Sequence, residues 1–182
     1  QIDRTEDTPE AGKTGREAAG MRRASGGEDQ IEHQFVTFMV NEEEYGCPIM
    51  RVREIQPWSH NVTRLPNQPS YVRGVINLRG TIIPIFDLRA RFHGERTEAD
   101  DRHVVITVAA MVQEEEIWAG LLVDAVSDIL SVPESELREL PEMQQTISDS
   151  YLTSLAAVEE RTVATVDIDR LLGQELMNGV SG

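Results

Sequence analysis

Cysteine is almost absent from this sequence: Cys47 is the only one, so no disulfide can form within the chain and a reducing compartment is expected. No apolar run reaches the length of about eighteen residues that a membrane-spanning helix needs. The amino end lacks the apolar core of a signal peptide, which favours a cytoplasmic protein. Aromatic residues make up only 5%, but 40% hydrophobic residues in 182 suffice for the core of one ordinary domain.

Basic residues are scarce relative to acids, with 17 Lys and Arg against 32 Asp and Glu and a net charge of -15. This charge argues against a nucleic-acid partner, because phosphate binding needs a basic surface. Residues 35–92 carry seven arginines and five acids (+2), whereas residues 93–182 carry five arginines and nineteen acids (-14). Two surfaces with different partners would explain this asymmetry, and so would a simple solubilising acidic surface.

Residues with metal-binding or catalytic potential form no recognisable motif. The histidines at positions 33, 60, 93 and 103 show no ligand spacing with one another or with Cys47, so we expect no metal site and no cofactor. Asp87, Asp124 and Asp167 each follow an apolar strand, and paired carboxylates can perform acid–base chemistry. An Asp before a short helix is more often an N-cap, so we predict that the protein is not an enzyme.

The two ends of the chain differ in composition from its middle. Residues 1–34 are rich in Gly, Ala, Glu, Thr and Arg and have almost no large apolar side chains, so we predict a disordered tail rather than a partner-binding arm. Residues 173–182 are predicted to be a short carboxyl-terminal tail. The ordered part is therefore expected to span residues 35–172.

A β-hairpin is predicted from Tyr71 to Arg89. Its first strand, Val72–Leu78, leads into a turn at Arg79-Gly80, and its second strand, Thr81–Phe86, is a continuous apolar run. Apolar residues on both sides of the turn predict burial of both strand faces. Arg79 is then the residue that core packing does not explain.

The ordered part reads as an internal duplication. With an offset of 74 residues, Tyr45–Ile55 aligns with Ala119–Ile129, and with an offset of 80, Ile82–Leu88 aligns with Thr162–Ile168. Short strands with turn signals indicate an all-β fold and small barrels rather than a parallel sheet. We expect two small β-barrels side by side with short helices, at about residues 35–92 and 104–172.

Several of these motifs resemble the CheW family. They are Glu44-Tyr45-Gly46, Val52-Arg53-Glu54-Ile55, Arg73 to Gly80 (RGVINLRG), Pro84 to Leu88 (PIFDL), Gly120 to Val126 (GLLVDAV) and Tyr151-Leu152. The resemblance runs from about Phe35 to Leu172. It implies two SH3-like five-stranded barrels and a non-catalytic adaptor that couples chemoreceptors to the histidine kinase CheA in chemotaxis. Such an adaptor is cytoplasmic and is recruited to membrane-associated receptor arrays without entering the membrane.

The resemblance also implies binding residues. The receptor surface would comprise Val52, Gly74, Arg79, Val104, Val126 and Ile129, and the kinase surface Glu54, Arg73 and Met143, the last in a ring-closing contact near Pro141-Glu142. The helix-like stretch Ile49–Ile55 would place Val52 in a groove between the barrels, with core packing as the alternative. For Arg79 the alternative is an internal ion pair with an acid such as Glu54, and Gly74 and Gly80 would first serve backbone geometry.

Two other functions remain open at this point. The same coupling role would fit a pathway such as pilus motility, and a carboxylate-based enzyme domain is the alternative from a different class. Retention of the chain by CheA and by a receptor fragment would separate these readings.

Overall fold

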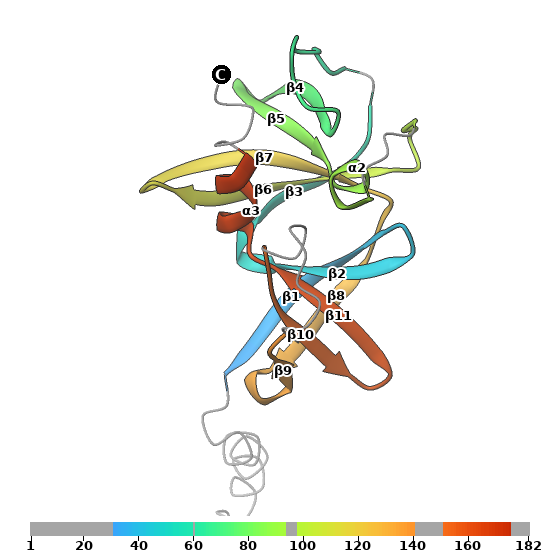
Figure 1. Ribbon diagram of the computed structural model, residues 1–182, viewed down its shortest axis with the longest axis vertical. Coiled ribbons are helices and arrows are strands. Elements are labelled where there is room, and N and C mark those ends of the chain that lie inside the picture. Colours follow the sequence, from blue (N-terminus) through green and yellow to red (C-terminus); the bar gives the residue numbers. More distant parts are fainter. Residues whose placement is uncertain (1–30, 60, 94–97, 141–150, 176–182) are drawn as a thin grey trace, which may run out of the picture.

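The computed structural model describes residues 31–59, 61–93, 98–140 and 151–175, which form two β-sheets and short helices (Figure 1). This confirms the predicted all-β class. Sheet A, at the bottom of Figure 1, has the order β8-β1-β2-β11-β10-β9, and sheet B, at the top, has the order β3-β6-β7-β5-β4. Among the helices in these ranges, none has the length and apolar character needed to cross a membrane.

The strands and helices have the following bounds. Sheet A contains β1 (Glu32–Val40), β2 (Glu43–Pro48), β8 (Ala125–Pro133), β9 (Leu137–Arg138), β10 (Leu152–Val158) and β11 (Arg161–Val166). Sheet B contains β3 (Val52–Pro57), β4 (Val72–Leu78), β5 (Thr81–Asp87), β6 (Val104–Val112) and β7 (Glu115–Val123). The α-helices are α2 (Leu88–His93) and α3 (Ile168–Glu175), and the 3-10 turns are η1 (Ile49–Arg51) and η2 (Glu134–Glu136).

The predicted hairpin is present as β4 and β5, with Leu78 opposite Thr81. Its turn residues Arg79 and Gly80 have φ values of 52° and 89°, the left-handed backbone that a two-residue hairpin turn matching the strand twist requires. The turn is fixed by a 2.8 Å hydrogen bond from the Gly80 N–H to the Asn77 side chain. The apolar run is not buried on both faces, however, since Ile82 is 60% exposed.

The duplication appears in the strand pairing. Strands β1 and β8 pair as β6 and β3 do, and the parallel pair β2 and β11 corresponds to the parallel pair β7 and β5. These strands of one sheet thus correspond to strands of the other sheet that come from the opposite half of the chain. The same backbone bond recurs at the offset of 80: Asp87 N–H donates to the Tyr71 carbonyl, and Asp167 N–H to that of Tyr151.

This exchange corrects the expected division into barrels at residues 35–92 and 104–172. Sheet A takes β1 and β2 from the first half and the rest from the second, while sheet B takes β3, β4 and β5 from the first half. The unequal charges of the two halves are therefore mixed between the sheets. Strand periodicity predicts that a strand exists, but hydrogen bonds between distant strands leave no mark in the local pattern.

The main core lies between the two sheets and includes residues of both. Phe38 and Cys47 of sheet A, Ile106 and Leu121 of sheet B, and Leu171 of α3 are all buried there. Helix α3 follows β11 of sheet A and packs against β6 of sheet B. The helix and the shared core therefore hold the two sheets in one arrangement.

Three element boundaries differ from expectation. The stretch predicted as helix-like, 49–55, is a 3-10 turn followed by strand β3, in which half-buried and exposed residues alternate, so Ile55 is 44% exposed rather than part of the core. Strand β1 begins at Glu32, inside the predicted tail, of which residues 1–30 lie outside the described part. Helix α3 continues to Glu175, past the predicted end at residue 172.

Candidate functional site

Arg79 at the hairpin tip forms an ion pair with Glu54 of β3. Its Nη2 donates to Glu54 Oε2 at 2.9 Å, so the internal pair left open as an alternative is present. The Arg79 side chain nevertheless remains 72% exposed, whereas that of Glu54 is 24% exposed. Because Arg79 has further N–H donors on its guanidinium, it can hold Glu54 and still offer a fork to a partner carboxylate.

A hollow of about 420 Å³ adjoins this ion pair. It lies between the outer strands of sheet B, and its walls include Gln56 and Pro57 of β3 and Ile76 and Leu78 of β4. Mixed apolar and polar walls beside an exposed guanidinium can receive a segment that has both an aliphatic side chain and a carboxylate.

The other predicted receptor residues differ in exposure. Val52, Val104 and Val126 are partly buried and pack against the core between the sheets, so they lie at its margin. Ile129 on β8 is 57% exposed. Gly74 is buried with φ 135°, and an added Cβ would lie 2.8 Å from Val62 Cγ1 and closer still to the Thr63 carbonyl oxygen. This supports the expectation that Gly74 first serves backbone geometry.

Arg73, predicted to contact the kinase, is buried and bound within the protein. Its Nε and Nη2 donate to Asp87 Oδ2 at 2.9 and 2.7 Å, and its side chain is only 8% exposed. A guanidinium in this position has little surface to offer a partner. Met143, the third predicted kinase residue, lies outside the described residues.

Asp87 is the centre of a buried arginine–aspartate–arginine group. Besides Arg73, it accepts hydrogen bonds from Arg89, whose Nε lies 2.9 Å from Oδ1 and whose Nη2 lies 3.0 Å from Oδ2. Burial alone would raise the pKa of Asp87, but the hydrogen bonds and charges of the two arginines outweigh it and hold the pKa below its ordinary value. This carboxylate is thus committed to charge neutralisation inside the fold.

The N-cap reading holds for two of the three aspartates. Asp87 accepts the backbone N–H of Arg89 at the start of α2, and Asp167 accepts that of Arg170 at 3.0 Å in α3. Asp124 is followed by strand β8, not a helix. Its Oδ2 accepts the backbone N–H of Asn41 at 2.6 Å.

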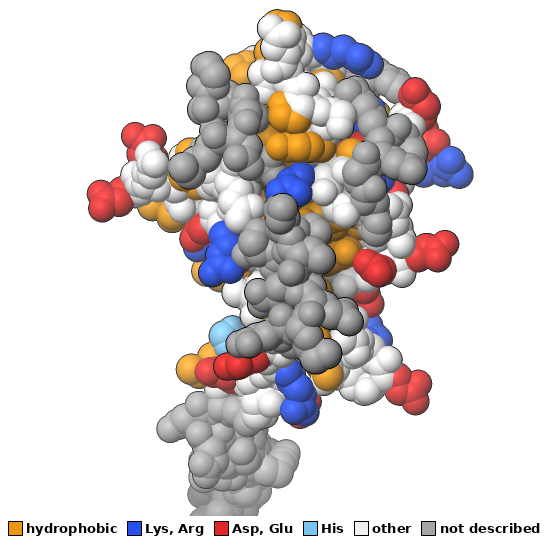
Figure 2. Space-filling model, viewed as in Figure 1, with side chains coloured by type: hydrophobic (Ala, Val, Ile, Leu, Met, Phe, Trp, Pro, Cys, Tyr) orange, Lys and Arg blue, Asp and Glu red, His pale blue; other side chains and the backbone are white. Residues whose placement is uncertain are grey.

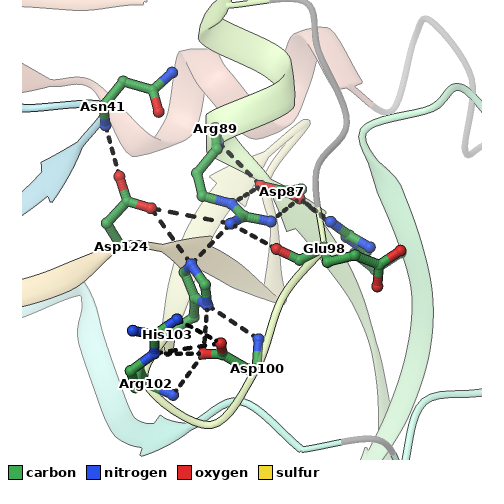
Figure 3. Close-up of polar contacts among 9 residues, drawn as sticks. Asn41, Asp87, Arg89, Glu98, Asp100, Arg102, His103 and Asp124 are labelled. Carbon is green, nitrogen blue, oxygen red and sulfur yellow. Dashed lines mark hydrogen bonds and ion pairs between the residues drawn. The ribbon is translucent and has the colours of Figure 1, made fainter.

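Asp124 belongs to a polar cluster that the sequence analysis did not identify. Figure 3 shows its carboxylate facing Arg89 and His103, at 4.0 Å from Arg89 Nη1 and 3.6 Å from His103 Nε2. On the other side of the ring, His103 faces Asp100, which pairs with Arg102. These residues come from the β1–β2 turn, α2, the segment before β6 and the crossover after β7, so no spacing in the sequence predicts them.

A second surface hollow, of about 600 Å³, lies where the parallel strands β5 and β7 diverge. Its walls include Ile82, Ile117 and Trp118. The equivalent place in sheet A is occupied by Arg161, which pairs with Glu44 of β2 and Asp128 of β8. No signal in the sequence indicated this hollow, because the apolar run that contains Ile82 suggested burial.

Acidic side chains are spread over both sheets. Figure 2 shows a group of them at the left-hand extremity, which in Figure 1 is the tip of the β6–β7 hairpin, where Glu114, Glu115 and Glu116 are exposed. Glu116 also lies 3.6 Å from Arg53 of β3. The negative charge thus marks a hairpin tip of sheet B and not a separate acidic domain.

Comparisons with known proteins agree with this architecture. Residues 34–176 match the family model of the CheW-like domain. The chain is 39% identical over 149 residues to the chemotaxis protein CheW of Klebsiella aerogenes, covering 82% of this chain and 87% of that protein. It is 33% identical over 142 residues to CheW of Bacillus subtilis, covering 78% and 88%.

A solved structure supports the same assignment. The crystal structure of the scaffolding protein TtCheW from Thermoanaerobacter tengcongensis superposes with a TM-score of 0.67 at 28% identity, covering 80% of this chain and 97% of that one. The two-sheet fold, the Arg79 hairpin and these matches lead to one conclusion. The chain belongs to the CheW-like domain family, a family of chemotaxis scaffold proteins.

Proposed function

We propose that this protein is a non-catalytic adaptor that couples chemoreceptor cytoplasmic tips to the histidine kinase CheA at membrane-associated receptor arrays. One observation carries the proposal beyond family membership: Arg79 is 72% exposed at a hairpin tip although it already pairs with Glu54. Holding such a guanidinium in a fixed orientation lowers the entropy cost of binding a carboxylate on a partner.

The receptor surface is proposed to centre on Arg79 and to continue over the margin of the core between the sheets. The partly buried Val52, Val104 and Val126 supply aliphatic contacts there, and the exposed Ile129 adds another. Gly74 acts indirectly, because it lets β4 approach the backbone at Thr63.

The kinase surface is proposed to include Glu54 on the first part of β3, with Met143 in a second, ring-closing contact. Arg73 is assigned a positioning role, because its guanidinium is directed to Asp87 inside the fold. The three aspartates that suggested catalysis have structural partners, which supports an adaptor rather than an enzyme.

Co-sedimentation of the full chain with purified CheA and with a receptor cytoplasmic fragment tests this function. We expect retention with each partner alone at micromolar concentration and a ternary complex when both are present. Failure to bind either partner at that concentration would end the adaptor proposal.

A charge exchange separates the two roles of Arg79. Arg79→Glu is expected to weaken receptor binding, and the double variant Arg79→Glu with Glu54→Arg restores the internal ion pair but not the exposed positive charge at the tip. If Arg79 contacts the receptor, the double variant binds as poorly as the single one; full recovery would show that only the internal pair matters. Glu159→Arg, at the equivalent turn position of the β10–β11 hairpin in sheet A, is the matched control and should bind normally.

A further inference from the structure

His103 lies where the two sheets meet through polar contacts. It precedes β6 of sheet B and faces Asp124, the residue at which the chain crosses from β7 of sheet B to β8 of sheet A. Asp124 fixes the β1–β2 turn of sheet A, because its Oδ2 accepts the Asn41 N–H at 2.6 Å and its own N–H donates to the Met39 carbonyl at 3.0 Å. Figure 3 shows this chain of contacts running from His103 through Asp124 to Asn41.

Each ring nitrogen of His103 faces one N–H donor and one carboxylate. Nδ1 lies 3.0 Å from the backbone nitrogen of Asp100 and 3.2 Å from its Oδ1. Nε2 lies 2.9 Å from Arg89 Nη1 and 3.6 Å from Asp124 Oδ1. A neutral imidazole has one N–H and one lone pair, so it satisfies one donor and one carboxylate, whereas an imidazolium satisfies both carboxylates and neither donor.

Arg89 cannot move away easily when the ring becomes charged. Its guanidinium donates to both carboxylate oxygens of Asp87 and, through Nη1, to the Glu98 carbonyl at 3.2 Å, and its side chain is 5% exposed. Two cations 2.9 Å apart in such a place repel strongly, since screening by water is weak there. The His103 side chain is 16% exposed against 5% for Arg89, so we expect His103 to be the partner that responds.

We propose that His103 is a proton-sensitive link between the sheets: protonation shifts its Nε2 from Arg89 to Asp124, the residue that holds the β1–β2 turn. The charged groups facing the ring are Arg89 from α2, Asp124 from the crossover, and Asp100 with its partner Arg102 from the segment before β6. Imidazole is the side chain whose ordinary titration falls between pH 5 and 8, so the proposal is tested in this range.

A second ion pair between the sheets serves as a reference for the change at His103. Arg51, at the equivalent crossover from β2 to β3, pairs with Asp169 of α3 at 2.9 Å, and Asp169 Oδ1 accepts the Met111 N–H at 2.8 Å. Among the residues that the structure describes, this second link consists of an arginine and an aspartate, without an imidazole. It therefore serves as the internal comparison in the test.

Amide and imidazole NMR spectra of the full chain between pH 5 and 8 test the proposal. We expect the Asn41 amide signal to shift with the same midpoint as the His103 ring, while the Met111 amide stays constant. In His103→Gln the Asn41 shift should be lost. His33→Gln should retain it, because His33 of β1 is an exposed imidazole whose ring lies near Glu134 of η2.

Three results would overturn the proposal. They are a His103 ring that does not titrate in this range, a constant Asn41 amide while the ring titrates, and an Asn41 titration that persists in His103→Gln. The first two come from the unaltered chain, so they remain informative even if the variant does not fold.

Discussion

Arg89 and Asp169 occupy equivalent positions 80 residues apart, each the second residue of a short helix, and they carry opposite charges. Arg89 lies 4.0 Å from Asp124 at one crossover between the sheets, and Asp169 lies 2.9 Å from Arg51 at the other. The duplicated fold thus keeps a helix-to-crossover ion pair in both copies but reverses its polarity. Within the described part of the chain, only the Arg89 copy includes a histidine partner.

The Arg51–Asp169 pair should contribute a modest coupling energy. Both side chains are about one-third exposed, so a double-mutant cycle with Arg51→Ala and Asp169→Ala is expected to give about 0.5–1 kcal/mol in urea unfolding. Asp169→Ala alone should cost more than this coupling, because the Met111 N–H also loses its acceptor. If the stability losses of the two single variants add up to the loss of the double variant, no ion pair couples the two side chains.

Removing the charge of Asp87 should destabilise the fold strongly. Asp87→Asn removes the buried carboxylate charge that both Arg73 and Arg89 contact, so we expect a loss of about 3–5 kcal/mol in the free energy of unfolding. Asp167→Asn is the matched control at the offset of 80. It has an N-cap role in α3, and because Asn caps a helix about as well as Asp, this variant should change the stability little. Similar losses in the two variants would refute the special role of Asp87.

Asp87 should also make stability depend on acid pH. Its pKa is lower in the folded state than the ordinary value of about 3.9 that applies after unfolding, so the unfolded chain binds its proton more readily. The stabilisation is therefore complete above that ordinary value and is lost as the pH falls through the folded-state pKa. Urea midpoints measured from pH 7 downward should fall less steeply for Asp87→Asn than for the unaltered chain; parallel curves would argue against this assignment.

Two glycines in the hairpin should respond differently to substitution. Gly74→Ala forces a Cβ against the backbone at Thr63, and we expect a loss on the order of 3 kcal/mol or more. Gly80→Ala meets no atom within 4 Å and should cost about 1 kcal/mol from its positive φ alone. Thermal unfolding followed by circular dichroism would measure both, and a ranking in the opposite order would be inconsistent with the packing at Thr63.

Cys47 should be unreactive in the folded protein. Burial raises the pKa of its thiol to about 12, although Arg51 opposes the shift, and the side chain is fully buried. We expect no reaction with Ellman's reagent at pH 8 until guanidinium chloride unfolds the chain. Rapid labelling of the native protein would show that the core between the sheets opens readily.

Local patterns predicted the elements better than their partners. The hairpin with Arg79 at its tip and the caps at Asp87 and Asp167 depend on residues close in sequence, and the structure contains them. Burial of Arg73 was missed because family resemblance assigned it to the kinase surface, although the predicted hairpin already brings it near Asp87, its partner inside the fold.

The candidate site shows the same division. Arg79 was identified because a charge in an apolar hairpin is a local anomaly, and its pairing with Glu54 was one of two stated possibilities. The cluster around His103 gave no signal, since its members approach one another only through the crossing of the chain between sheets. Exposure of Ile82 was missed because β5 and β7 separate beyond their short parallel contact.

The exchange of strands between the two halves has a consequence for how the chain folds. Strand β11 lies parallel to β2 in sheet A, with Ala164 opposite Tyr45, so that sheet cannot be completed until segments more than a hundred positions apart have met. Such long-range pairing slows folding, because the entropy of closing a large loop is lost before the contacts form. Neither repeat should fold as an isolated fragment, and separately expressed halves should regain structure only when mixed.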